Sequence, residues 1–291
     1  MKTNSKDMVA VDSCMLVYGP KNTMKQQLMR AYKASNIRFH NIREVDMQFC
    51  TFDIGKDKYL VIKGTKGQKD IITDLDVFSY DPLLKRIILR HKHGKQWVKS
   101  YKKEIKRIKG VIKSMKFRLM HFGFFKSAEA IATYMVKNGL EPDYIMGHSL
   151  GGGVAHPLAM FMTHTLKGII TFGAPRSGGI KFALMYNRRY KKITRRFFND
   201  KDVVPKVPFR IMFFMHVAKG LYFNHKGRLK SRMEQFRDLG KYFTKSNIKK
   251  DIKIGISDYK KTKKIPEFIQ DHLLDTINPL GYYNNVRKNM V

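Results

Sequence analysis

The sequence contains little cysteine, little tryptophan and no long apolar run. Its two cysteines, Cys14 and Cys50, are too few for a disulfide framework, so a reducing compartment is expected, and a single bridge between them stays open. No apolar stretch reaches the roughly 18 residues of a membrane-spanning helix, and residues 1–7 lead into no secretory signal. We therefore expect a cytoplasmic protein, with peripheral attachment to a membrane or to a virion as alternatives.

Acidic residues are also scarce. The chain has 58 Lys and Arg against 23 Asp and Glu, a formal net charge of +35. This imbalance predicts attraction to anionic partners, either phospholipid surfaces or nucleic acid. The lysines are spread along the whole chain, so a lysine-rich composition that merely solvates the surface is an equally good interpretation. Since no zinc-finger, helix-turn-helix or RNA-recognition pattern is present, any nucleic-acid affinity is expected to be non-specific.

The order of expected elements indicates the fold class. No repeat, low-complexity segment or linker divides the chain, so residues 1–291 are expected to form one domain. Helices are expected at 21–34, 125–138 and 154–166, and strands at 47–52, 59–62, 143–146, 168–172 and 195–198. Strands that alternate with helices predict an α/β protein with a mostly parallel central sheet and helices on both faces.

Residues 85–118 form a basic insertion in this pattern. They hold 14 Lys and Arg and one acid, Glu104. Apolar residues three or four positions apart predict an amphipathic helix; these are Val98, Tyr101, Ile105, Ile108 and Ile112. Two interpretations stay open: a lid or membrane-facing element, or a surface helix whose apolar stripe packs on the core.

The strongest chemical motif is Gly147-x-Ser149-x-Gly151, which follows an expected strand and precedes an expected helix. A serine at so tight a strand-to-helix turn needs neighbours without side chains, so that the backbone folds back while Oγ projects outward. The alternative is a glycine-rich helix start. In this context the motif predicts that Ser149 is a nucleophile.

A serine nucleophile needs a base and an acid that orients the base. In hydrolases with this elbow the acid and then the histidine follow the serine along the chain. Asp202 and Asp200 are the candidate acids, and Asp202 is favoured by a proline three residues on. His272, near the C-terminus, is the favoured base over His216, which lies in an apolar run that is typical of a core histidine.

The negative oxygen of a tetrahedral intermediate needs hydrogen-bond donors. The backbone N–H of Leu150 is expected to be one, and the turn at Gly64 and Thr65 is in the right place for the second. The histidines are scattered and neither cysteine sits in a ligand-spaced pair, so we expect no metal, and the chemistry requires no cofactor.

Six short segments resemble the class 3, fungal-type lipase family of α/β-hydrolases in the family's order. They are residues 61–65, 120–124, 147–152, 171–176, 199–208 and 271–273. The resemblance implies an oxyanion role for Thr65, with Lys63 where the family usually has Arg, and a structural role for His121. It also selects Asp202 over Asp200 as the acid and His272 as the histidine of a Ser149 triad.

These observations predict a serine hydrolase that cleaves lipid esters, triacylglycerol or a related glycerolipid, through an acyl-enzyme. The alternatives are a phospholipase of the A type on anionic membranes, and a catalytically idle binding protein that keeps the hydrolase fold. We expect a lipid ester as substrate and peripheral contact with an anionic lipid surface. The oligomeric state is left open.

Overall fold

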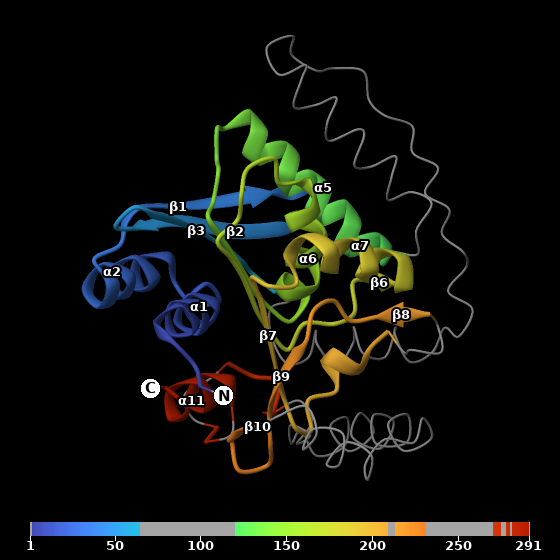
Figure 1. The fold of residues 1–291 in the computed structure, drawn as a ribbon. Coiled ribbons are helices and arrows are strands. Elements are labelled where there is room, and N and C mark those ends of the chain that lie inside the picture. Colours follow the sequence, from blue (N-terminus) through green and yellow to red (C-terminus); the bar gives the residue numbers. More distant parts are fainter. Residues whose placement is uncertain are drawn as a thin grey trace, which may run out of the picture.

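The computed structural model describes residues 2–64, 120–208, 213–230, 270–274, 278–279 and 281–290. An eight-stranded sheet in the order β1-β2-β3-β4-β5-β7-β9-β10 runs through this part of the chain (Figure 1). Neighbouring strands from β3 to β9 pair parallel, whereas β1-β2, β2-β3 and β9-β10 pair antiparallel. The strands are β1 (Ser35–Ile42), β2 (Met47–Ile54), β3 (Asp57–Ile62), β4 (Tyr144–His148), β5 (Gly168–Phe172), β7 (Thr194–Asn199), β9 (Gly220–Phe223) and β10 (Leu229–Lys230). The predicted α/β class with a mostly parallel sheet is confirmed.

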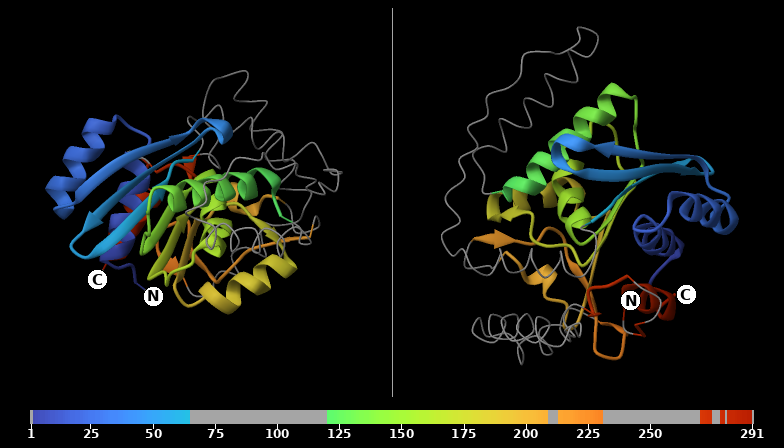
Figure 2. Two further views of the ribbon diagram at one scale, coloured as in Figure 1. Left: turned by 90° about the horizontal axis from the view of Figure 1, so that it is seen from above. Right: turned by 180° about the vertical axis from the view of Figure 1, so that it is seen from behind.

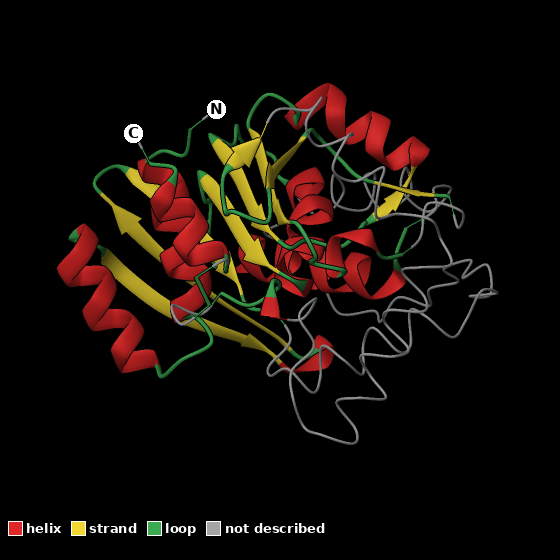
Figure 3. Ribbon diagram, turned by 90° about the horizontal axis from the view of Figure 1, so that it is seen from below, coloured by secondary structure: helices red, strands yellow, loops and turns green. Residues whose placement is uncertain are grey.

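Helices cover both faces of the sheet. The helices α1 (Ser5–Leu16), α2 (Lys21–Tyr32) and α11 (Tyr282–Lys288) lie on one face, and α5 (Phe122–Lys137), α6 (Leu150–Phe161) and α7 (Ile180–Tyr190) lie on the other (Figures 2 and 3). The side chains form two apolar cores accordingly, one on each side of the sheet. The central strands are buried on both faces, and every residue of β5 is buried, which is why they read as continuous apolar runs in the sequence.

The expected elements appear with shifted ends. The strand expected at 143–146 is β4, and the strand at 195–198 is β7. The helix expected at 125–138 begins earlier, at Phe122, where the His121 ring accepts a hydrogen bond from the backbone N–H of Phe124 and caps it. The structural role expected for His121 is therefore confirmed. Burial lowers the pKa of His121 to about 4.

Both expected ends of one helix are wrong. The helix expected at 154–166 is α6, which begins earlier, at Leu150, and ends at Phe161, where Met162 takes an extended conformation. The loop that follows is held by His164, whose Nε2 donates to the carbonyl of Pro142 at 2.7 Å. Both Met162 and Leu166 are buried in this loop. Their apolar character therefore reflects core packing, not a continuing helix.

Several elements had no expected counterpart, among them α1, β1, α7, α11 and the small sheet of β6 (Gly178–Gly179) and β8 (Phe214–Met215). The helix α1 carries buried residues around much of its circumference, which obscures the helical period. The expected basic insertion at 85–118 lies outside the described residues. Cys14 and Cys50 are both buried free thiols in one apolar core.

The two ends of the chain meet beside the sheet (Figure 1). The backbone N–H of Thr3 donates to the carbonyl of Asn289 at 2.9 Å. The buried carboxylate of Asp7 pairs with Arg195 of β7 at 2.6 and 2.7 Å, which fixes α1 to the sheet. None of the helices in the described ranges has the length and apolar character needed to cross a bilayer.

Candidate active site

Ser149 lies at a strained turn between β4 and α6. Its φ of 56° and ψ of −127° are values that side chains other than glycine rarely adopt. The neighbouring glycines are required by close backbone packing: a Cβ on Gly147 would lie 2.5 Å from the carbonyl of Gly151, and a Cβ on Gly151 would lie 2.3 Å from the carbonyl of Ile62. The turn therefore has the geometry of a nucleophile elbow, at the carboxyl ends of the parallel strands.

Asp202 follows β7 at the same edge of the sheet and is fully buried. Its two oxygens lie 2.9 and 3.0 Å from Nδ1 of His272. Because a carboxylate only accepts, Nδ1 of His272 is the donor of this bond. The carboxylate also accepts from the backbone N–H of Val204 at 2.9 Å and from the hydroxyl of Tyr282 at 2.5 Å.

The alternative acid, Asp200, faces a different neighbour. Its carboxylate accepts a hydrogen bond from the hydroxyl of Tyr222. Of the other late histidines, His216 donates from Nε2 to the carbonyl of Pro205 at 2.6 Å, and His225 is exposed. The structure therefore pairs Asp202 with His272, as expected from the sequence, and engages Asp200 and His216 elsewhere.

His272 lies against the elbow. Its ring is fully buried beside Gly173, where a Cβ would approach Cε1 and Nδ1 to 2.7 Å. The residue before Gly173, Phe172, accepts a hydrogen bond from the backbone N–H of Ser149 at 3.0 Å. Within the described residues, Nε2 of His272 is buried without a hydrogen-bond partner. That nitrogen can accept a proton, because Nδ1 carries the proton of the neutral ring.

Residues that the sequence reasoning missed hold this arrangement. The hydroxyl of Tyr282, at the start of α11, donates to Asp202 and accepts from the backbone N–H of Asn199 at 3.0 Å. Asp271 accepts from the backbone N–H of Lys201 at 3.0 Å, and its carbonyl accepts from the Asn199 side chain at 2.7 Å. Asp271 lies in the segment 271–273 that the sequence resemblance marked, whereas no motif marks Tyr282.

Of the two expected oxyanion donors, Leu150 lies within the described residues. Leu150 is the first residue of α6, so its backbone N–H has no acceptor inside the helix and lies at the positive end of the helix dipole. Thr65 lies outside the described residues. Among the residues described, no group of three or more His, Cys, Asp or Glu side chains is placed to hold a metal ion.

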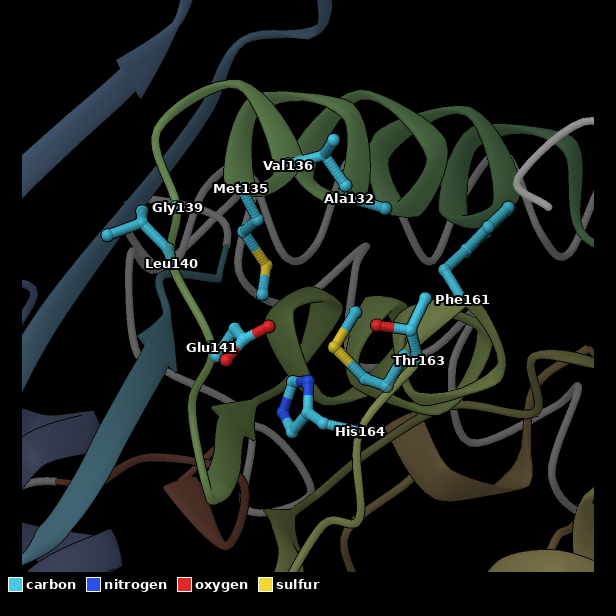
Figure 4. Close-up of a pocket in the computed structure, with 10 residues that line it drawn as sticks. Ala132, Met135, Val136, Gly139, Leu140, Glu141, Phe161, Thr163 and His164 are labelled. Carbon is cyan, nitrogen blue, oxygen red and sulfur yellow. The ribbon is translucent and has the colours of Figure 1, made fainter. Parts of the chain in front are cut away.

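A separate cavity of about 340 Å³ lies at the opposite edge of the sheet, where β4 begins (Figure 4). It is lined by the C-terminal turn of α5, the loop at 139–141 and the residues after α6, including His164. Ser149 follows the other end of β4. This cavity therefore does not belong to the candidate active site.

Comparisons with known proteins agree with this geometry. Residues 59–212 match the family described as Lipase (class 3). Among solved structures, lipase II from Rhizopus niveus is similar at 19% identity and a TM-score of 0.50, covering 75% of this chain and 79% of that one. The lipase from Rhizopus microsporus var. chinensis is similar at 18% identity and a TM-score of 0.51, covering 75% of this chain and 73% of that one. The triacylglyceride lipase of Rhizomucor miehei is similar at 17% identity and a TM-score of 0.50, covering 75% of this chain and 79% of that one. No curated protein sequence matches.

The similar solved structures show the fold of the chain. The family match shows which family the chain belongs to, because it spans more than half of the chain, from β3 through the elbow to residues after Asp202. The chain belongs to the class 3 lipase family of α/β-hydrolases and is a lipase-like carboxylic-ester hydrolase.

Proposed function

We propose that this chain hydrolyses glycerolipid esters with Ser149 as nucleophile, His272 as general base and acid, and Asp202 as the group that orients His272. The observation that carries the proposal is the buried Asp202–His272 pair beside the strained elbow. The pair fixes the proton of His272 on Nδ1 and leaves the buried Nε2 as the acceptor for a serine proton.

The reaction proceeds in two halves. Ser149 Oγ attacks the ester carbonyl carbon while its proton moves to Nε2 of His272, and the N–H of Leu150 donates to the oxygen that becomes negative. The second donor is assigned to Thr65. The protonated His272 then gives its proton to the departing alcohol as the C–O bond breaks, which leaves an acyl-enzyme. Water repeats these steps with His272 as base and releases the fatty acid.

Two substrate classes compete, and different observations favour each. The similar lipase of Rhizomucor miehei is described as a triacylglyceride lipase, which favours neutral glycerolipid. The net charge of +35 favours an anionic phospholipid surface, and with it an activity of the phospholipase A type. Charge steers association and does not select the bond that is broken, so we propose the lipase reaction first.

Contact with an anionic lipid surface is part of the proposal, and α7 supports it. This helix contains no acidic residue, and the side chains of Ile180 and Leu184 are 52% and 56% exposed on one face, four residues apart. α7 connects β5 to β7, so it begins at the edge of the sheet where Ser149 lies. The same charge supports non-specific, salt-sensitive binding of nucleic acid. The cytoplasmic location and the single domain stay predictions.

The first test is hydrolysis of a short p-nitrophenyl ester by wild type and Ser149→Ala. Loss of the nucleophile should lower kcat by about 10⁴-fold or more. Ser35→Ala, at an exposed position at the start of β1, is the matched control and should keep full activity. If wild type turns over no faster than Ser149→Ala on every ester, even with a lipid interface present, the chain is the idle binding protein and the proposal fails.

The second test separates the substrates. Faster release of fatty acid from a triacylglycerol emulsion than from phosphatidylglycerol vesicles supports the lipase, and the reverse supports the phospholipase. Sedimentation with the same vesicles then tests the lipid contact. The double variant Ile180→Ser, Leu184→Ser should bind less than wild type, and unchanged binding would remove α7 from the proposed contact.

A further inference from the structure

The residue before the nucleophile, His148, is placed to act on His272. Its ring is buried and lies 4.5 Å, centroid to centroid, from the ring of His272. Its Nε2 lies 2.7 Å from the backbone carbonyl oxygen of His272. A carbonyl only accepts hydrogen bonds, so Nε2 of His148 carries a proton and donates it to this bond.

The contact of the other ring nitrogen, Nδ1 of His148, agrees with a proton on Nε2. Burial and the neighbouring His272 lower the pKa of His148 well below its ordinary value, so the ring holds a single proton. With that proton on Nε2, Nδ1 is an acceptor, and the hydroxyl of Tyr18 donates to it at 3.0 Å. The His272 carbonyl thus sets the tautomer of His148, and the Tyr18 hydroxyl supports it by donating to the free Nδ1.

Tyr18 reaches the site from the end of α1, on the opposite side of the sheet from α6. Its hydroxyl also lies against Gly64, where a Cβ would come within 2.2 Å of it and within 2.6 Å of the His148 carbonyl. Gly64 directly precedes Thr65. The Tyr18 hydroxyl thus contacts both the turn expected to supply the oxyanion donor and the ring next to Ser149.

The bond from His148 to the backbone carbonyl of His272 differs from the other contacts of the histidine segment, residues 271–273. Asp202 fixes the ring of His272, and Asn199 and Lys201 fix the preceding residue, Asp271. All of these contacts tie the histidine segment to the end of β7 and the loop after it. Among the described residues, the bond from His148 ties this segment directly to the elbow, because His148 and Ser149 are adjacent in the chain.

We infer that Tyr18 and His148 are positioning residues for the Ser149 reaction: Tyr18 orients the His148 ring, and His148 holds the main chain of His272 at its working distance from Ser149. The inference rests on the proposed function, since it concerns the geometry of that triad. Neither side chain exchanges a proton with the substrate. Each acts by keeping His272 in place, and displacements of about 1 Å at such a group reduce turnover by about 10²-fold.

The test uses three variants of the full chain on a soluble p-nitrophenyl ester. His148→Leu removes the donor to His272 and should lower kcat by about 10²-fold. His148→Gln places an amide N–H near the position of Nε2 and should recover about tenfold of that loss. Tyr18→Phe removes the hydroxyl alone and should lower kcat by about tenfold. KM should stay within about twofold of wild type, since neither residue is proposed to bind the substrate.

Tyr134→Phe is the matched control. The hydroxyl of Tyr134 on α5 lies 3.2 Å from Nδ1 of His40 on the edge strand β1, so this contact, like that of Tyr18 and His148, joins a tyrosine hydroxyl to a histidine Nδ1. Its loss should leave kcat unchanged. Ring nitrogen chemical shifts give an independent signature, with His148 protonated on Nε2 in wild type and the Nδ1 resonance shifted in Tyr18→Phe, where Nδ1 loses its donor.

The outcomes separate the two proposals. If Ser149→Ala is inactive while folded Tyr18→Phe and His148→Gln keep kcat within about twofold of wild type, the positioning inference is wrong and the proposed function stands. A rise in KM without a fall in kcat would also overturn the inference, because it would indicate a binding role. If His148→Leu does not fold, Tyr18→Phe and His148→Gln still decide. If Ser149→Ala matches wild type, the proposed function itself fails.

Discussion

Gly173 offers the sharpest test of the packing around His272. The residue has a φ of +57° and lies beneath the His272 ring. An added Cβ would lie 2.7 Å from Cε1 and Nδ1 of that ring and 3.0 Å from Oδ2 of Asp202. Two separable costs follow from Gly173→Ala, one from the left-handed backbone and one from the collision with His272.

The backbone cost is about 1 to 2 kcal/mol for a residue with a Cβ at positive φ. The collision is larger in its effect on activity. Carbon atoms in contact prefer a separation of about 3.5 Å, so a ring atom at 2.7 Å must retreat by about 0.8 Å. A retreat of that size either lengthens the bond to Asp202 or moves Nε2 relative to Ser149, and it should lower kcat/KM by about 10²-fold.

Gly139→Ala isolates the first cost. Gly139 has a φ of +61°, and a Cβ there would meet nothing within 4 Å. It should therefore lose about 1 to 2 kcal/mol of unfolding free energy and no activity. Kinetics on a soluble p-nitrophenyl ester and urea unfolding of both variants give the comparison. The reasoning is refuted if Gly173→Ala keeps activity within about threefold of wild type, or if Gly139→Ala loses as much.

Three further changes test the framework of the site. Tyr282→Phe removes one of the donors to Asp202 and should cost about 2 kcal/mol of unfolding free energy and lower kcat by about tenfold, with unchanged values counting against its role. Burial lowers the pKa of His156 to about 3. The unfolded chain therefore binds a proton near pH 6.5 that the folded chain does not, and stability should fall as the pH drops below about 6.5, by about 2 kcal/mol at pH 5 from this residue. Urea midpoints at pH 7.5 and pH 5 measure the loss, and equal midpoints would contradict it. Asp7→Asn breaks the ion pair with Arg195, whose side chain is 30% exposed, and should cost about 2 to 3 kcal/mol of unfolding free energy. Thermal or urea unfolding measures this cost, and a loss under about 0.5 kcal/mol would show that the pair is dispensable.

The sequence specifies those parts of the fold whose signal is local. The apolar runs of β4 and β5 are continuous because both faces are buried, and the elbow needs its glycines within a few residues of Ser149. The helix α1 is less readable because its polar residues are buried too. Ser13 bonds the carbonyl of Val9, and Asp7 needs Arg195 nearly 190 residues later.

The candidate site divides in the same way. Ser149 and Asp202 lie within the family match at 59–212, whereas His272 lies beyond it and was selected by its position near the C-terminus and by the short segment 271–273. Tyr18 and Tyr282 had no signal at all. A tyrosine that serves a site through its hydroxyl alone looks, in sequence, like any other half-apolar residue. Only the folded chain shows which of the tyrosines reach His148 and Asp202.

These two tyrosines give the layer of α1 and α11 a part in the proposed chemistry. Tyr282, on α11, donates to the carboxylate that orients His272, and Tyr18, after α1, donates to the ring that holds the His272 backbone. The layer is itself tied together, since the hydroxyl of Thr3 bonds the carbonyl of Val286 at 2.8 Å. A hydrogen bond of the right length at His272 therefore depends on packing on the face of the sheet opposite to α6. Loosening that layer should lower turnover before it unfolds the sheet, because the contacts at His272 tolerate less displacement than the apolar cores do.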